Sequence, residues 1–359
     1  MKKIIKIFVS ILIIFSFSII ISIFHLSNIR RSSYNIQKDN FNKITNQTKD
    51  EYLINEQSFY SFDINNTKLN EIQMLASHNS YKLKGSKLGK FFIRLFKNKK
   101  EADQLEYEYL TLTNQLNLGI RSFELDIRYR KNNFETIHVP LVDNASNALN
   151  FQLALDEINL FSSRNTNHLP IIVILEIKDD FNFLDFNLKK IDNNKLKQLN
   201  NIILNTFTNN LIKPKDIIQN NLSINESVNK YGWPNINNLL GKVMFVIHAS
   251  KYAKMYNNIY LPNDANLFIS GYIDDVDNKD VSIIIHNNLD VESIKKVVAK
   301  NLLVRTRIDE NLSYNINNFT LAINSNAQIL TSDFLIARKD LKEEPLYFNN
   351  KHTVISKKE

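Results

Sequence analysis

The feature that most constrains the fold is a series of eight short apolar runs that begins near residue 68 and ends near residue 335. The runs read IQMLA, IRSFELDIR, TIHV, IIVILEI, KVMFVIH, NLFISGY, LLVRTR and QILTSDF. Longer polar or helical stretches separate them, and several are almost continuously apolar, which is typical of parallel strands covered on both faces. Eight such strands predict a (β/α)8 TIM-like barrel, with an open doubly wound sheet as the alternative.

Polar and ionisable residues gather at the C-terminal ends of these runs. They are His78 and Asn79 after the first run, Glu124 and Asp126 late in the second, His138 in the third, and Glu176 and Lys178 at the end of the fourth. Barrel enzymes build their active sites from the ends of several different strands. The pattern therefore favours the barrel over the open sheet and predicts a site at that end.

Three of these residues are carboxylates within apolar runs. Glu124 and Asp126 are two residues apart, so a strand points both side chains to the same face. Buried carboxylates that lie side by side repel each other unless a cation or a proton intervenes. With Glu176 and the amide oxygen of Asn79 they form a set of four oxygen donors, which suits Ca²⁺ or Mg²⁺ better than Zn²⁺. The alternatives are a solvated acidic face for the first pair and an ion pair with Lys178 or an arginine for Glu176.

Two histidines accompany this acidic set. Imidazole titrates near neutral pH, so His78 and His138 can divide the work of general base and general acid. We expect the other five histidines to be structural, although His248 closes the fifth run and is a candidate to line the site. These five are His25, His168, His248, His286 and His352.

Six separated motifs resemble, in the same order, the calcium-dependent phosphatidylinositol-specific phospholipase C family of bacteria. They are NEIQMLASHNSY, YEYLTLTNQLNLGIRSFELDIR, IHVPLVDNAS, WPNINNLLGKVMFVIH, LLVRTRID and AQILTSDF, within residues 68–335. The resemblance implies a TIM-like barrel of the phospholipase C-like phosphodiesterase superfamily, with a calcium ion at its C-terminal face. Motif position implies two catalytic histidines, His78 and His138, and four calcium ligands, Asn79, Glu124, Asp126 and Glu176.

The resemblance also implies a reaction. A phosphatidylinositol-type lipid is cleaved to diacylglycerol and an inositol phosphate, with a cyclic and a hydrolysed product both open. The inositol 2-hydroxyl attacks phosphorus while the calcium ion neutralises charge in the transition state. His78 acts as base or stabilises the phosphorane, and His138 protonates the departing diacylglycerol oxygen.

Four further residues are candidate substrate contacts. Lys178 shares a strand face with Glu176, so it can contact a phosphate or simply pair with a carboxylate. Asp333 ends the last run and would lie beside His78 if the barrel closes, where it could orient that ring. Arg305 and Arg307 alternate in LLVRTR and therefore face one way, which suits either an ion pair inside the barrel or a substrate contact.

The N-terminus predicts a membrane-inserting segment. Residues 7–24, IFVSILIIFSFSIIISIF, carry no charge, and at about 1.5 Å per residue they reach roughly 27 Å. We interpret residues 1–29 as a signal anchor or a signal peptide, and the lack of a small-x-small cleavage pattern after the segment favours the anchor. Three lysines precede the segment and only Arg30 and Arg31 closely follow it, so the positive-inside rule places the catalytic part outside the cytoplasm, anchored or secreted.

The remaining boundaries follow from composition. Residues 30–67 are rich in Asn, Gln, Ser and Lys without a sustained period, so we expect a flexible linker. The barrel should occupy residues 68–345, and residues 346–359 should form a polar C-terminal tail. The chain has no cysteine, which excludes disulfides and thiolate metal sites.

A basic and aromatic stretch, YKLKGSKLGKFFIRLFKNKK, lies between the first and second runs. Its cations are Lys82, Lys84, Lys87, Lys90, Arg94, Lys97, Lys99 and Lys100. Cations beside Phe91, Phe92 and Phe96 suit an interfacial segment that contacts anionic lipid, with a surface helix of solvated lysines as the alternative. We expect these three phenylalanines to contact membrane.

Two other functions compete with the phospholipase. A glycerophosphodiester phosphodiesterase also uses a barrel, two histidines and a metal, but its family shows His-Arg-Gly where this chain has His78-Asn79-Ser80. An inactive membrane-tethered barrel could bind lipid headgroups, although binding alone needs no general acid. The formal charge of +8 is not spread as a nucleic-acid coat, and no obligate protein partner is indicated.

Overall fold

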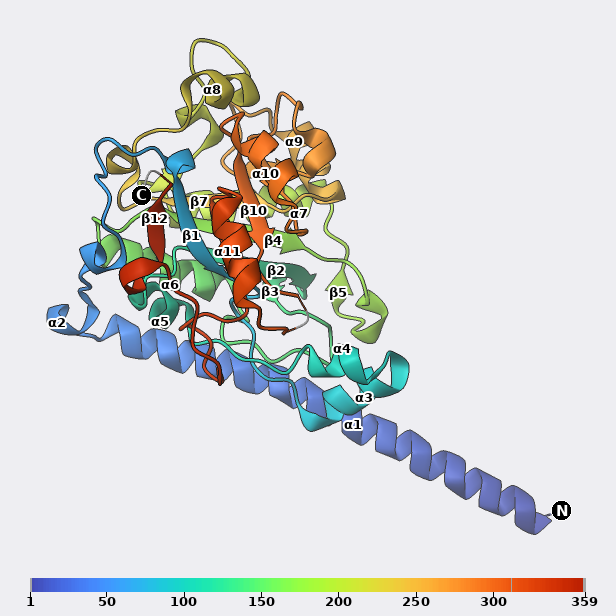
Figure 1. Cartoon of the computed structure of the whole chain (residues 1–359). Helices are drawn as coiled ribbons and strands as arrows, with labels where there is room; N and C mark the ends of the chain where they lie inside the picture. Colours follow the sequence, from blue (N-terminus) through green and yellow to red (C-terminus); the bar gives the residue numbers. More distant parts are fainter. Residues whose placement is uncertain (1, 311, 358–359) are drawn as a thin grey trace.

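Eight parallel strands close into a barrel in the computed structural model, which describes residues 2–310 and 312–357 (Figure 1). Strand β1 is parallel to β2 on one side and to β11 on the other, and these pairings close the barrel. In order, the barrel strands are β1 (Ile72–Ser77), β2 (Ser122–Arg130), β4 (Ile171–Ile177), β7 (Val243–Ile247), β8 (Phe268–Gly271), β9 (Ile283–Ile285), β10 (Leu303–Arg307) and β11 (Ile329–Ser332).

Four short strands extend this sheet outside the ring, and helices surround it. The added strands are β3 (Asn133–Thr136), β5 (Leu188–Lys189), β6 (Leu211–Ile212) and β12 (Val354–Ser356). The helices are α1 (Lys2–Thr45), α2 (Lys49–Tyr52), α3 (Lys87–Phe96), α4 (Lys99–Asp103), α5 (Leu112–Asn117), α6 (Phe151–Arg164), α7 (Asn193–Thr206), α8 (Ile224–Tyr231), α9 (Lys251–Ile259), α10 (Val291–Val298) and α11 (Ile316–Asn324).

The core follows from the apolar pattern of strands and helices. Strand β4 is buried along its length except at Glu176, because one face points into the barrel and the other lies under helices. Helix α6 begins at the N-cap Asn150, whose side chain accepts from the backbone N–H of Leu153. It then buries Ala154, Ile158 and Phe161 at helical spacing.

The barrel prediction is confirmed, but one predicted strand was wrong and one barrel strand was missed. TIHV is not a barrel strand: β3 ends at Thr136 and pairs antiparallel with β2 through a two-residue turn at Lys131 and Asn132. Both turn residues have positive φ, the conformation of a tight hairpin. The missing barrel strand is β9, whose three residues were too short a run to stand out.

Residues 30–45 are helical, which contradicts the expected flexible linker. They continue α1 without a break, and Leu26, Ser33 and Gln37 are buried against the barrel. These three positions share one helix face, but two of them are polar, so no apolar period marked the contact. The Gln37 side chain donates to the Asn150 carbonyl over 3.0 Å and accepts from the Asn150 N–H over 2.7 Å.

The other two expected boundaries also differ from the structure. Glu56, in the second half of the expected linker, is buried and pairs with the buried Arg121 guanidinium. At the other end, Phe348 and Val354 are buried, and β12 pairs antiparallel with β1. Residues 346–357 therefore pack on the barrel and add a strand beside β1, rather than forming a polar tail.

The N-terminal half of α1 projects beyond the barrel, whereas its C-terminal half lies along it (Figure 1). In the described part of the chain, α1 is the one helix long and apolar enough to cross a membrane. Its apolar side chains from Ile4 to Phe24 are exposed, as a lipid-facing segment would be. Helix α3 lies beside α1 near the point where α1 leaves the barrel, and α4 packs on α3 (Figure 1).

Candidate active site

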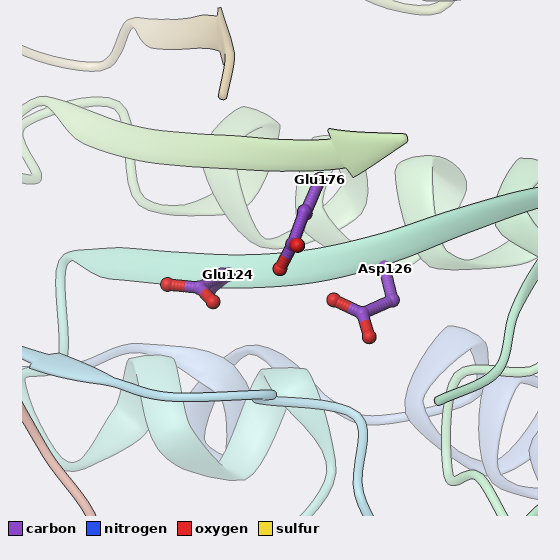
Figure 2. Close-up of side chains that lie close together, drawn as sticks. All are labelled: Glu124, Asp126 and Glu176. Atoms are coloured by element: carbon purple, nitrogen blue, oxygen red, sulfur yellow. The ribbon is translucent and has the colours of Figure 1, made fainter. Parts of the chain in front are cut away.

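Neighbouring strands bring three carboxylates together at the C-terminal end of the barrel. Glu124 and Asp126 lie on β2, and the parallel register places Asp126 opposite Glu176 of β4. One oxygen from each carboxylate lies within 4.8 Å of the others. Figure 2 shows the Glu176 side chain reaching from its own strand toward the two acids of β2.

The oxygens of this acidic cluster are suited to a cation. Asp126 is fully buried, and its Oδ1 accepts no hydrogen bond from the described residues. Asn79 is also buried, its amide nitrogen donates to the Tyr107 hydroxyl over 3.1 Å, and its Oδ1 has no donor among those residues. Unpaired buried oxygens are costly, so a hard cation fits this set.

Two basic side chains offset part of the negative charge. The Lys178 ammonium lies 2.7 Å from Asp126 Oδ2 and 3.4 Å from Glu176 Oε2. Burial and then the Asp126 charge raise the pKa of Glu176, and Lys178 offsets them only partly. For Glu124, burial raises the pKa, but the Arg305 guanidinium and the nearby histidines His78 and His248 together outweigh burial and hold the pKa at about 2.

Barrel closure sets the environment of His78. Because Ser77 is opposite Ser332 in the β1–β11 register, the next residues, His78 and Asp333, come together. His78 Nδ1 lies 3.2 Å from Asp333 Oδ1, and its Nε2 lies 3.8 Å from Glu124 Oε1. The structure thus places one ring nitrogen on a buried carboxylate and the other beside the acidic cluster.

His138 has an equivalent partner that the sequence analysis missed. Its Nδ1 lies 3.0 Å from Asp143 Oδ2, while Lys82 Nζ lies 2.7 Å from Asp143 Oδ1. Lys82 and Asp143 are both buried, so Lys82 does not belong to a solvated lysine face. The VPLVD spacing after His138 was the available signal for Asp143, whereas Lys82 was hidden among neighbouring lysines.

The two arginines predicted as substrate contacts already have protein partners. Arg305 is buried and donates to Glu124, to Asn287 and, over 3.0 Å, to Thr331 Oγ1. Arg307 is partly exposed, and its guanidinium lies 3.7 Å from Asp333 Oδ2. Arg305 is therefore positioned to hold Glu124, while Arg307 keeps access to the mouth of the barrel.

The remaining histidines and the phenylalanines of α3 occupy distinct positions. His168 is buried, with its ring nitrogens 2.6 Å from the Leu169 carbonyl and 2.8 Å from Ser162 Oγ, a structural role. His248 follows β7 and lowers the pKa of both Glu124 and Glu176, so it lies near the acidic cluster.

On α3, Phe91 and Phe96 are 56% and 77% exposed, and the rings of Phe92 and Phe96 stack with their centroids 6.2 Å apart.

A parallel barrel with a buried acidic cluster and two histidines paired with aspartates has the parts of a barrel enzyme that uses a metal ion and general acid–base catalysis. The family model described as "Phosphoinositide phospholipase C, Ca2+-dependent" matches residues 67–133 and 128–354. The chain therefore belongs to this family, and it is an enzyme that cleaves phosphoric diesters of the phosphoinositide type.

Solved structures show the same fold. A calcium-dependent phosphoinositol-specific phospholipase C from a Gram-negative Pseudomonas species is 18% identical, with a TM-score of 0.62, over 84% of this chain and 99% of that chain. A myo-inositol complex from the same source is 17% identical, with the same TM-score and coverage. A Ca²⁺-dependent phosphatidylinositol-specific phospholipase C from Streptomyces antibioticus is 14% identical, with a TM-score of 0.55, over 74% of this chain and 95% of that chain. No curated protein matches the chain.

Proposed function

We propose that this enzyme cleaves phosphatidylinositol in a calcium-dependent reaction that releases diacylglycerol and an inositol phosphate. The observation that carries the proposal is that His78, paired with Asp333, lies beside a three-carboxylate cluster. The second histidine, His138, has a matching aspartate partner in Asp143. Membership of the family and the myo-inositol complex of a similar barrel support an inositol headgroup.

Four residues would hold the calcium ion: Asn79, Glu124, Asp126 and Glu176. Bound there, calcium would supply charge neutralisation at the phosphate and lower the pKa of the inositol 2-hydroxyl. Arg305 fixes the orientation of Glu124, and Lys178 forms an ion pair with the buried Asp126. Mg²⁺ is the weaker candidate, because it favours few carboxylates and several retained waters.

The two histidines divide the proton transfers. With Nδ1–H donated to Asp333, His78 exposes a basic Nε2 that accepts the proton of the inositol 2-hydroxyl as its oxygen attacks phosphorus. The Nδ1 atom of His138 is hydrogen-bonded to Asp143, which leaves Nε2 directed to the substrate. His138 donates a proton from Nε2 to the glycerol oxygen as the P–O bond breaks. These steps balance to diacylglycerol and a cyclic inositol phosphate, which water can open by the reverse proton transfers.

We propose that α1 anchors the catalytic barrel outside the cytoplasm. Its apolar residues 7–24 are exposed, and its basic residues precede that segment. The exposed Phe91 and Phe96 would add interfacial contact at the mouth of the barrel.

The test is turnover of radiolabelled phosphatidylinositol by the full chain in bilayer nanodiscs, with calcium and then with chelator. The full chain is required because residues 26–59 pack on the barrel. Calcium-dependent release of diacylglycerol supports the proposal. Release of free inositol phosphate from glycerophosphoinositol but not from the lipid would indicate a glycerophosphodiester phosphodiesterase instead.

A further inference from the structure

A cavity of about 260 Å³ lies between α1 and the barrel, outside the active site. One wall is the α1 segment from Phe24 to Arg31, and the other walls are the β2–β3 turn, the loop at residues 137–144 and the start of β5. The volume is just below the roughly 300–1,000 Å³ of pockets for drug-sized ligands, so it suits a headgroup-sized fragment.

The cavity is basic, and two of its cations have no ion-pair partner in the part of the chain that the structure describes. Arg30 is paired with Glu135, and Arg130 Nε lies 2.7 Å from Asp185 Oδ2. Arg31 and Lys131, by contrast, take part in no ion pair within residues 2–310 and 312–357. The positive φ of Lys131 in its tight turn places this lysine at the cavity. Two free cations in one hollow favour an anionic ligand.

The cavity begins where the apolar half of α1 ends. Phe24 is the last residue of the uncharged segment, and it forms part of the wall together with Ser27 and Asn28 of the next turn. If residues 7–24 cross the hydrocarbon layer, the cavity lies at the depth of the lipid headgroups. An acyl chain could then follow the exposed apolar surface of α1 below it.

The same cavity borders the loop that carries His138. Ile137, Pro140, Leu141 and Asn144 line the cavity, while His138 and Asp143 of the same loop pair with each other. Asn144 donates to the Leu26 carbonyl of α1 over 2.9 Å. A ligand in the cavity would therefore contact both the anchor helix and the loop that positions a catalytic histidine.

From these observations we infer that the cavity binds the phosphate-bearing headgroup of an anionic phospholipid whose acyl chains lie along α1. Arg31 and Lys131 contact the phosphate, and Asn28 is close enough in the wall to add a polar contact. This inference rests on the membrane placement of α1 within the proposed function, but it does not require turnover of inositol lipid. Bound lipid would brace the His138 loop, so that the anchored enzyme is most active on an anionic membrane.

The test is native mass spectrometry of the full chain released from detergent micelles, titrated with phosphatidylglycerol or phosphatidylcholine in the presence of chelator. Two variants attack the cavity: Arg31→Gln with Lys131→Gln removes its free cations, and Ser27→Trp fills it without a change of charge. The matched control, Lys279→Gln with Lys296→Gln, removes two exposed lysines that lie outside the cavity and make no ion pair in the described chain.

We expect the wild type and the control to retain one phosphatidylglycerol per chain in preference to phosphatidylcholine. Both cavity variants should weaken that binding by roughly tenfold or more, since juxtamembrane cations each contribute to the attraction of anionic lipid. Equal binding by the cavity variants and the control would overturn the inference. Equally tight binding of soluble glycerol 3-phosphate at the cavity would also overturn it, because the site would then recognise free phosphate esters. Because binding is measured without catalysis, a failed turnover assay leaves this result unaffected.

Discussion

Lys82 and Asp143 form a fully buried ion pair, with Lys82 Nζ 2.7 Å from Asp143 Oδ1. Lys82 also donates to the carbonyls of Leu83 and Leu105, each over 3.0 Å. Burial raises the pKa of Asp143, but Lys82 and His138 together outweigh this effect and lower the pKa below its ordinary value. The pair thus keeps a charged carboxylate beside His138.

Removing this lysine should destabilise the protein. Lys82→Met leaves Asp143 without its cation, so we expect a loss of about 3–5 kcal/mol in the free energy of unfolding. Lys84→Met is the matched control, because Lys84 pairs with Asp340 near the surface and its loss should cost at most about 1 kcal/mol. Urea unfolding of both variants measures the difference. Equal effects would show that Lys82 has no special role in holding Asp143.

Calcium should stabilise the folded protein through the acidic cluster. A ligand that binds only the folded state at 100 times its Kd adds about 2.7 kcal/mol, which raises the thermal midpoint. Asp126→Asn should abolish this calcium-dependent shift, because Asp126 is the fully buried member of the cluster. Asp185→Asn, at a carboxylate remote from the cluster, should retain it. An undiminished shift in Asp126→Asn would place calcium elsewhere.

The exposed phenylalanines of α3 should contribute to membrane contact. Replacing Phe91 and Phe96 by serine removes two large apolar side chains, each worth roughly 1.5–3 kcal/mol when fully buried. We expect weaker activity on anionic vesicles at low lipid concentration and unchanged maximal activity at high concentration. Ile316→Ser removes an exposed apolar side chain of α11 and serves as the control. An unchanged lipid dependence in the phenylalanine variant would contradict this role.

Asp309 should make stability depend on pH. Burial and then the charge of Asp333 raise the pKa of Asp309 to about 7, against a partial offset by the hydrogen bond from Ser332. Because this folded-state pKa exceeds the unfolded value, the folded chain holds an extra proton, and the stability that this proton supplies is complete only below about pH 4. It is lost as the pH rises toward 7, by up to about 4 kcal/mol.

The measurement for Asp309 is urea unfolding of the wild type and Asp309→Asn between pH 4 and pH 8. In the variant, this fall in stability should flatten, because the neutral amide cannot lose a proton. The wild type should lose stability over that range more steeply than the variant does. Parallel pH profiles would show that Asp309 is ionised throughout.

Much of the barrel could be predicted because its strands are apolar on both faces. The acids of β2 and β4 stood out for the same reason, since a carboxylate in an apolar strand needs a partner. The packing of α1 on the barrel could not be predicted, because Ser33 and Gln37 make that contact with polar side chains. The role of Lys82 could not be predicted either, because nothing in the sequence distinguishes this buried lysine from the more exposed lysines beside it.

The most direct test of the account compares two substrates in His78→Ala and His138→Ala. On phosphatidylinositol, each variant should lose roughly 10²–10⁴-fold in kcat, as expected for loss of a general base or a general acid. A p-nitrophenyl ester of inositol phosphate has a leaving group that departs without a proton. We expect this substrate to restore most of the rate in His138→Ala and little of it in His78→Ala. Equal rescue of both variants, or of neither, would contradict the assignment of His138 as the acid and His78 as the base.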